Sequence, residues 1–140
     1  MMVETEDSAQ PPFLAAELPT TVVQRLEAER GALQRVRLAV RADLAPDGQF
    51  GEQWLLIDDR DLWVIENRDG GVLRYRFALD DITDAKVERC VGNGLLQIVV
   101  QERPQVLLHY TNDLTDQFGH IAHYLRRRAE DGPDTPVPDP

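Results

Sequence analysis

Seven short apolar stretches between Leu33 and Tyr110, followed by one amphipathic segment, constrain the fold of this chain more than any other feature. In the first stretch apolar and polar residues alternate without a break. Its apolar positions are Val36, Leu38, Val40, Ala42 and Leu44. A period of two is typical of an antiparallel strand with one face buried and one face in water. Because no helical pattern lies between the stretches, they predict a meander rather than a parallel sheet.

Turn sequences separate the other stretches. Pro46-Asp47-Gly48 reverses the chain after the first strand, and Gly92-Asn93-Gly94 is a tight hairpin signal before the sixth. Pro104 is expected to break the sixth strand. The remaining strands are expected at about residues 51–57, 62–66, 73–79, 84–91, 95–101 and 105–110.

A short helix is expected before the strands. Pro19 and Thr20-Thr21 supply its start and Gly31 its stop. Its apolar face is formed by Leu18, Val22, Val23 and Leu26. Such a helix can cover one side of a barrel but is too short to be stable alone.

A longer helix is expected after the strands, from about residue 112 to residue 129. Thr111, Asn112 or Asp113 can cap its N-terminus. A single apolar stripe runs along it, made by Leu114, Phe118, Ile121, Ala122 and Leu125. We expect this helix to plug the open end of the barrel.

The 140 residues fit one domain with extended ends. We expect a flexible acidic arm over 1–16, the N-terminal helix over 17–31, the barrel domain over 32–129 and a Pro/Asp-rich linker or tail over 130–140. The last ten residues contain four prolines and three aspartates and have almost nothing to bury.

The formal net charge of −10 narrows the choice of partners. Nucleic-acid binding relies on Lys and Arg that neutralise phosphates, so the charge argues against it, and it argues against anionic lipid for the same reason. Arg126, Arg127 and Arg128 are together in the sequence, but at a helix C-terminus cations complement the dipole. The acidic start and the absence of a long apolar run predict a cytoplasmic chain. A lone Cys90 is expected to be a small buried residue.

Three segments resemble the pleckstrin-homology-like (PH-like) and GRAM-type domains of bacteria. Trp54–Val64, with the sequence WLLIDDRDLWV, is similar to their "(T/D)-D-R-R-L" hairpin, although Asp61 stands where an arginine is common. Gly71-Val72-Leu73 leading to Phe77–Ile82 is similar to their "g-g-v-l…(I/F)-p-L-d-d-I" segment. Gly92–Leu96 is similar to their "G-n-G-x-L" hairpin.

The resemblance covers roughly residues 33 to 128 and implies a mainly β, α+β fold. It is a PH-like barrel or sandwich of seven antiparallel strands, with a C-terminal capping helix and a short N-terminal helix. In PH domains that bind phosphoinositides, basic residues cluster in the loop between the first two strands. Here that loop, residues 45–49, has no Lys or Arg, which argues against lipid headgroup recognition.

The whole chain resembles the cytosolic region that precedes the membrane spans of certain bacterial ABC exporters. The resemblance rests on Leu18-Pro19 with Gln24–Glu27, then the barrel, then the tail. It implies a non-catalytic accessory or interaction module at the inner face of the membrane, with its own downstream transporter domains or a peptide strand as partner. The ATPase motif G-x-x-x-x-G-K-[ST] does not occur, and Lys86 lies in Ala85-Lys86-Val87. The alternatives are a stand-alone PH-like domain that binds a peptide or small ligand, and a small enzymatic barrel.

No pattern of catalytic, metal-binding or cofactor-binding residues is found. His120 and His123 are three apart on the second expected helix, but no third metal ligand has a recognisable spacing. Ser8, the one serine, lies in the acidic arm without a partner. A ligand site or an enzyme would need a pocket of convergent polar groups, and the one cluster to nominate is His109, His120, Asp116 and Tyr124.

The acidic pairs are expected to form solvated turns. Asp58-Asp59, Asp80-Asp81 and Asp113 with Asp116 lack the alternating oxygen donors and glycine of a calcium loop. Trp54 and Trp63 are expected to pack in the core or on one sheet face, and the pattern leaves open which of them faces inward. The expected core is Val36, Leu38, Val40, Leu56, Val64, Tyr75, Phe77, Ile82, Leu96, Ile98, Val100, Leu107, Leu114, Phe118, Ile121 and Leu125.

An open barrel leaves strand edges with unpaired N–H and C=O groups, to which a peptide strand or a second copy can add. The expected strand from Asp84 to Val91 looks like an edge that Lys86, Glu88 and Arg89 protect. Because the net charge repels identical copies, we expect a chain that is mainly monomeric at micromolar concentration, with any dimer strengthening as salt rises.

Overall fold

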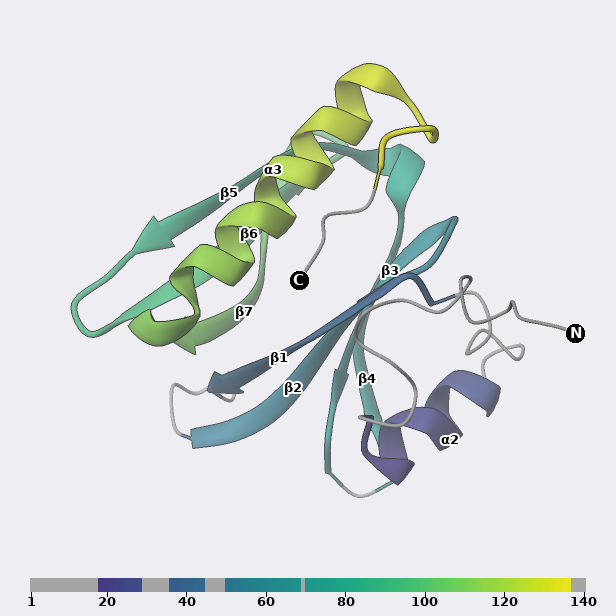
Figure 1. The fold of residues 1–140 in the computed structure, drawn as a ribbon, viewed down its shortest axis with the longest axis vertical. Coiled ribbons are helices and arrows are strands. Elements are labelled where there is room, and N and C mark those ends of the chain that lie inside the picture. The colour runs from purple at the N-terminus through teal and green to yellow at the C-terminus, as the bar shows by residue number, and fades with distance from the viewer. Residues whose placement is uncertain (1–17, 29–35, 45–49, 69, 137–140) are drawn as a thin grey trace, which may run out of the picture.

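The computed structural model describes residues 18–28, 36–44, 50–68 and 70–136 (Figure 1). Within these residues the fold is mainly β, with seven antiparallel strands in one sheet, a C-terminal helix and a short N-terminal helix. The expected acidic arm, the helix stop at Gly31, the loop 45–49 and the end of the tail lie outside the described residues.

All seven expected strands are present close to their expected bounds. They are β1 (Leu38–Leu44), β2 (Phe50–Ile57), β3 (Asp61–Glu66), β4 (Val72–Ala78), β5 (Ile82–Arg89), β6 (Asn93–Val100) and β7 (Arg103–Thr111). The order across the sheet is β4-β3-β2-β1-β7-β6-β5, so two meanders, β1–β4 and β5–β7, are joined where β1 meets β7. Figure 1 shows the two meanders diverging from this junction.

The turn between β6 and β7 differs from the expectation. Gln101 (φ 53°) and Glu102 (φ 67°) both adopt the left-handed conformation and reverse the chain between them. Pro104 therefore lies inside β7, opposite Val99, and the prediction that it breaks the preceding strand is wrong. A proline is tolerated there because β1 pairs with β7 only between Leu44 and His109, which leaves the start of β7 as an edge among the described residues.

The C-terminal helix α3 (Thr115–Asp131) packs against β5 and β6 and closes the larger hydrophobic core. Phe118 is fully buried and stacks on Tyr110 with 4.5 Å between the ring centroids. Gly94 makes room for this pair, because a Cβ on it would lie 2.6 Å from the Tyr110 ring. No side chain caps the helix: the 3-10 turn η5 (Asn112–Leu114) leads into it with Leu114 at the N-cap, so the cap expected at Thr111, Asn112 or Asp113 is wrong.

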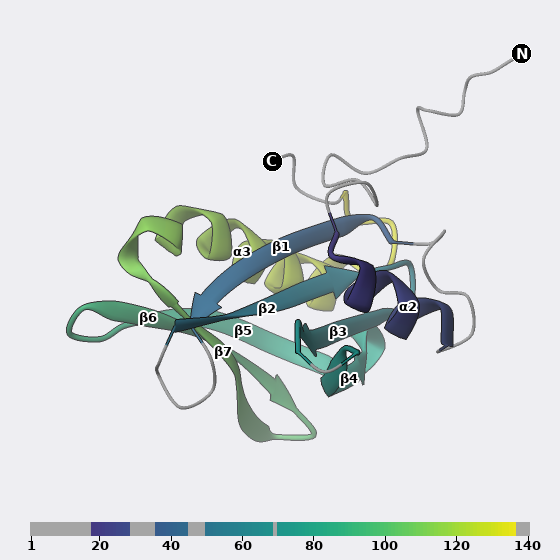
Figure 2. The same cartoon turned by 90° about the horizontal axis from the view of Figure 1, so that it is seen from below.

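A second, smaller core lies on the other side of the first meander, under the N-terminal helix α2 (Thr20–Ala28). Val22 and Leu26 of α2 are fully buried there, and both tryptophans, Trp54 and Trp63, face this side. Every residue of β3 is buried, because one core covers each of its faces. Figure 2 shows α2 beside β3, and Figure 1 shows α2 apart from α3.

Most of the expected core is buried, with four residues only partly so. Tyr75, Phe77, Val100 and Leu114 pack at the margin of the larger core. Cys90 is exposed, so the prediction of a buried thiol is wrong. The reason is local: its N–H donates to the Asn93 carbonyl (2.7 Å) and closes the hairpin turn, which leaves Cys90 at the tip.

The junction between the two meanders is held by Asp43 and Thr111. Asp43 accepts hydrogen bonds from the Thr111 amide (2.9 Å) and hydroxyl (2.6 Å). Burial opposes the ionisation of Asp43, but the hydrogen bonds from Thr111, together with the amide of Asp43 itself and the charge of Arg41, outweigh it and lower the pKa of the carboxyl below its ordinary value of 3.8.

Replacing Asp43 with asparagine is expected to destabilise the fold by about 1 kcal/mol at neutral pH, the usual contribution of a charge-assisted hydrogen bond. A folded-state pKa below the unfolded value contributes stability that is present above pH 3.8 and lost as the pH falls through the folded pKa. The difference in the free energy of unfolding between the wild type and Asp43→Asn should therefore disappear in acid. Urea titrations from pH 7 to pH 2.5 measure it, and a gap that stays constant over this range would contradict the assignment.

Candidate functional site

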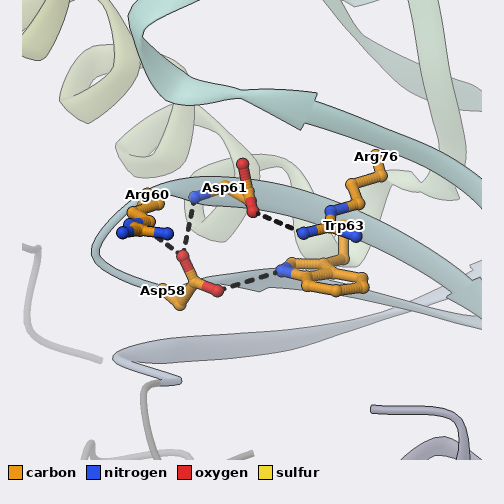
Figure 3. Close-up of polar contacts among 5 residues, drawn as sticks. All are labelled: Asp58, Arg60, Asp61, Trp63 and Arg76. Atoms are coloured by element: carbon orange, nitrogen blue, oxygen red, sulfur yellow. Dashed lines mark hydrogen bonds and ion pairs between the residues drawn. The ribbon is translucent and has the colours of Figure 1, made fainter. Parts of the chain in front are cut away.

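The β2–β3 turn contains the most deeply buried carboxylate among the described residues (Figure 3). Asp58 is 1% exposed. Its Oδ1 accepts hydrogen bonds from the amides of Arg60 and Asp61 (2.6 Å each), and its Oδ2 accepts one from Trp63 Nε1 (3.2 Å). Both oxygens are thus occupied by the protein, and Asp58 shapes the hairpin rather than facing a ligand.

A second layer extends this network to β4. Asp61 Oδ2 accepts a hydrogen bond from Arg76 Nη2 (3.0 Å), and the Arg76 guanidinium lies 4.2 Å from the centroid of the Trp63 ring (Figure 3). The prediction that the acidic pairs form solvated turns is therefore wrong for Asp58, because the indole and two amides supply donors that permit its burial. Asp59, Asp80, Asp81, Asp113 and Asp116 are exposed, as expected.

The outer edge of β5 is sealed at its centre. In an antiparallel ladder, hydrogen-bonded and non-hydrogen-bonded residue pairs alternate. Because Cys90 and Asn93 form a hydrogen-bonded pair, Ala85 belongs to a non-hydrogen-bonded pair, and its N–H and C=O groups point away from β6. The Ala85 amide donates to Asp84 Oδ1 (2.8 Å), and its carbonyl accepts from Arg126 Nη1 of α3 (2.7 Å). A strand adding to β5 would have to break both contacts. The structure confirms that β5 is an edge strand, and it is Asp84 and Arg126, not the charges named from the sequence, that occupy the outward groups of Ala85.

The outer edge of β4 is different. Within the described part of the chain, β4 is the last strand of the sheet and pairs with β3 alone. The Leu79 amide donates to the Arg60 carbonyl (2.8 Å), so these two residues form a hydrogen-bonded pair at the end of the β3–β4 ladder. Because hydrogen-bonded and non-hydrogen-bonded pairs alternate, the N–H and C=O groups of Arg76 and Ala78 point away from β3. None of the residues of β4 is buried, although all those of β3 are. This edge can accept hydrogen bonds from another chain.

A cavity of ≈ 180 Å³ lies between the two meanders, where β2, β4 and β7 converge. We call it the mouth. Its polar lining is Gln53, Arg74, Tyr75 and His109, and its apolar lining is Val106, Leu107 and Leu108. Of this polar set, the sequence predicts only His109 as a candidate site residue, and it predicts Tyr75 in the core. The available signals were Gln53, a polar residue at an inward position of its strand, and Arg74, the extra residue of a β-bulge between Leu73 and Tyr75.

A second, more open cavity of ≈ 490 Å³ lies along the outer side of α3 and is lined by His120, His123, Tyr124 and Arg127 together with 131 and 134–136. The nominated cluster is therefore not brought together: His109 lines the mouth, His120 and Tyr124 line the α3 cavity, and Asp116 is exposed in the first turn of α3. In the described ranges no three His, Cys, Asp or Glu side chains are placed to hold a metal ion.

The two buried tyrosines keep their protons at neutral pH. Burial raises the pKa of Tyr110 to about 12. Burial also raises the pKa of Tyr124, against the opposing effect of Arg128 and Arg37. Neither hydroxyl is available as a base, and the Tyr110 hydroxyl donates to the Leu95 carbonyl (3.3 Å).

The three consecutive arginines near the end of α3 have separate roles. Arg126 binds the β5 edge, Arg127 pairs with Asp131 (2.8 Å), and the buried Arg128 pairs with Asp80 (3.0 Å). They therefore contact different partners on α3, β5 and η4 (Leu79–Asp81) instead of forming one cationic patch.

No protein-family model matches this chain, and no curated protein matches its sequence. None of the helices in the described ranges has the length and apolar character needed to cross a membrane. The geometry of the β4 edge and of the mouth therefore carries the functional argument.

Proposed function

We propose that this chain is a non-catalytic interaction module that recruits an extended protein segment to the outer edge of β4. The observation that carries the proposal is the contrast between the two ends of the sheet. At β5 the outward backbone groups of Ala85 are occupied by Asp84 and Arg126, whereas β4 ends the sheet and no described strand pairs with the outward groups of Ala78. An open edge of this kind is the surface used in β-strand addition.

The geometry limits where an added strand can pair. The bulge at Arg74 bends β4, so the regular part of the edge is Tyr75–Ala78. Tyr75 and Phe77 stack with 5.8 Å between their ring centroids and are half-buried. They offer an apolar surface to one side of an incoming strand, and Arg76 lies on the other. Main-chain hydrogen bonds would supply affinity, and the aromatic pair would select the side chains that pack against it.

The resemblance described above extends the proposal to a fold family and a setting. Two meanders joined by their first and last strands, with a helix packed against the second, are compatible with a PH-like domain. We propose that the module works on the cytoplasmic side of the membrane as the N-terminal part of an ABC-type exporter, with downstream transporter domains as its partner. A stand-alone PH-like domain that binds a peptide from another protein is the alternative.

Ala78 offers a sharp test of strand addition. Its N–H points outward and its φ is −67°, which is the value that a proline ring imposes. Ala78→Pro therefore removes one outward donor without straining the backbone or breaking the β3–β4 ladder. Peptides selected from a random ten-residue display library should bind Ala78→Pro at least about tenfold more weakly than the wild type, the effect of losing one well-placed hydrogen bond.

Ala78→Val is the matched control, because it enlarges the side chain but keeps the N–H. It should bind the selected peptides as the wild type does, and thermal unfolding should show both variants folded. Peptides that bind Ala78→Pro and wild type equally, or a library that yields no binder, would refute strand addition at β4. The exporter setting is tested separately. Membrane spans and a G-x-x-x-x-G-K-[ST] motif in the same reading frame would support it. Another gene context would refute the exporter setting and leave strand addition at β4 unaffected.

A further inference from the structure

We propose that the mouth between β2, β4 and β7 binds a compact carboxylate, with the Arg74 guanidinium as its main partner. This inference does not rest on strand addition, since it uses the inner side of β4 and no outward backbone group. It assigns the small ligand that was considered among the alternatives to one chemical class, the carboxylates.

The floor of the mouth is rigid. Gln53 is 1% exposed, and its Nε2 donates to the Leu44 carbonyl (3.0 Å), which fixes the side chain against the end of β1. Opposite Gln53 in the β2–β3 ladder lies Glu66, which is 6% exposed and whose Oε1 makes no hydrogen bond. A buried carboxylate oxygen without a donor is costly and indicates that its surroundings are built around a charge.

Arg74 supplies the positive charge beside Glu66 without donating a hydrogen bond to its Oε1. Its Nη1 lies 3.7 Å from Glu66 Oε1, which is within ion-pair range and beyond hydrogen-bond length. The guanidinium lines the cavity and carries five N–H donors in a planar fork, a shape that matches a carboxylate. A ligand carboxylate can therefore take hydrogen bonds that Glu66 does not.

The rest of the lining fits the remainder of such a ligand. The Tyr75 hydroxyl and the His109 imidazole can each donate a further hydrogen bond, and Val106 and Leu107 face a short apolar body. A volume of ≈ 180 Å³ equals that of roughly six liquid water molecules, which suits one small organic acid. The net charge of −10 opposes the approach of any anion, but salt screens this repulsion beyond about 10 Å while the contact with Arg74 is local.

Two sources offer this chemistry: a free organic acid, and the C-terminal carboxylate of a protein chain. The experiment titrates the full chain with benzoate, with isovalerate and with a tetrapeptide ending in leucine, and follows backbone amide shifts by NMR. We expect one saturable site, with shifts centred on the mouth and a Kd on the order of 1 mM for the free acids. Benzamide and the amidated tetrapeptide, which keep the shape and lack the carboxylate, should not bind.

Arg74→Gln should weaken carboxylate binding at least tenfold. Arg68→Gln is the matched control, because Arg68 also pairs with Glu66 (3.8 Å) but does not line the mouth, so it should bind as the wild type does. Tighter binding of the free tetrapeptide than of the acids assigns the site to a protein C-terminus, and the reverse assigns it to a small molecule. Equal effects of the two substitutions, equal binding of benzamide and benzoate, or no saturation up to about 20 mM would overturn the proposal.

Discussion

Replacing Asp58 with alanine is expected to destabilise the fold by about 3 kcal/mol. The carboxylate accepts three hydrogen bonds inside the protein, and its removal leaves the amide of Asp61 and the indole of Trp63 without an acceptor in a buried site. Hydrogen bonds to charged groups contribute about 1.5–3 kcal/mol each, and orphaned buried donors add a desolvation penalty. Urea denaturation followed by circular dichroism measures the loss.

Two variants control this prediction. Asp58→Asn keeps one acceptor oxygen and should lose about half as much, whereas Asp81→Ala, at an exposed carboxylate in η4, should change the free energy of unfolding by less than about 0.5 kcal/mol. If Asp58→Ala and Asp81→Ala were equally stable, the β2–β3 network would not stabilise the hairpin.

Replacing Phe118 with alanine is expected to be still more damaging, at about 4 kcal/mol. Phe118 is fully buried where α3 meets the sheet, and its ring stacks on Tyr110. Truncating a buried phenylalanine removes its transfer free energy and leaves a cavity, which together cost about 3–5 kcal/mol. Phe118→Leu should cost less than half as much, because it refills most of the volume.

The readout for Phe118→Ala is the midpoint of thermal unfolding at a fixed protein concentration. For a domain of this size, 4 kcal/mol corresponds to a fall of very roughly 10–20 °C. A fall similar to that of Phe118→Leu would mean that α3 repacks onto the sheet without this ring.

The strands could be predicted from sequence because each carries its own signal. Alternation in β1 and the turns at Asp58–Asp61 and Gly92–Asn93 are local patterns, and they locate elements without any knowledge of distant contacts. The prediction failed where a side-chain contact made only in the folded structure decides the outcome. Asp58 was expected in a solvated turn, because the sequence does not show that the Trp63 indole donates a hydrogen bond to its carboxylate. Strand β3 shows no alternation, because both of its faces are buried, so the flanking turns locate it.

The candidate site was harder to predict for the same reason. Gln53, Arg74 and His109 come from three different strands, and only the bending of the sheet brings them to one cavity. The edges depend on pairing order: β4 and β5 are neighbours in sequence but form the two ends of the sheet. From the sequence, Arg126 was expected to complement the helix dipole, but it donates a hydrogen bond to the Ala85 carbonyl.

The junction between β1 and β7 also sets the order in which the molecule can fold. Asp43 and Thr111 are separated by 68 positions, whereas every other strand pair joins consecutive strands. Each meander can form from local contacts, and loop-closure entropy delays the contact that spans the chain. The transition state for folding should therefore contain the meanders before their junction, so destabilising substitutions at Asp43 would accelerate unfolding more than they slow folding.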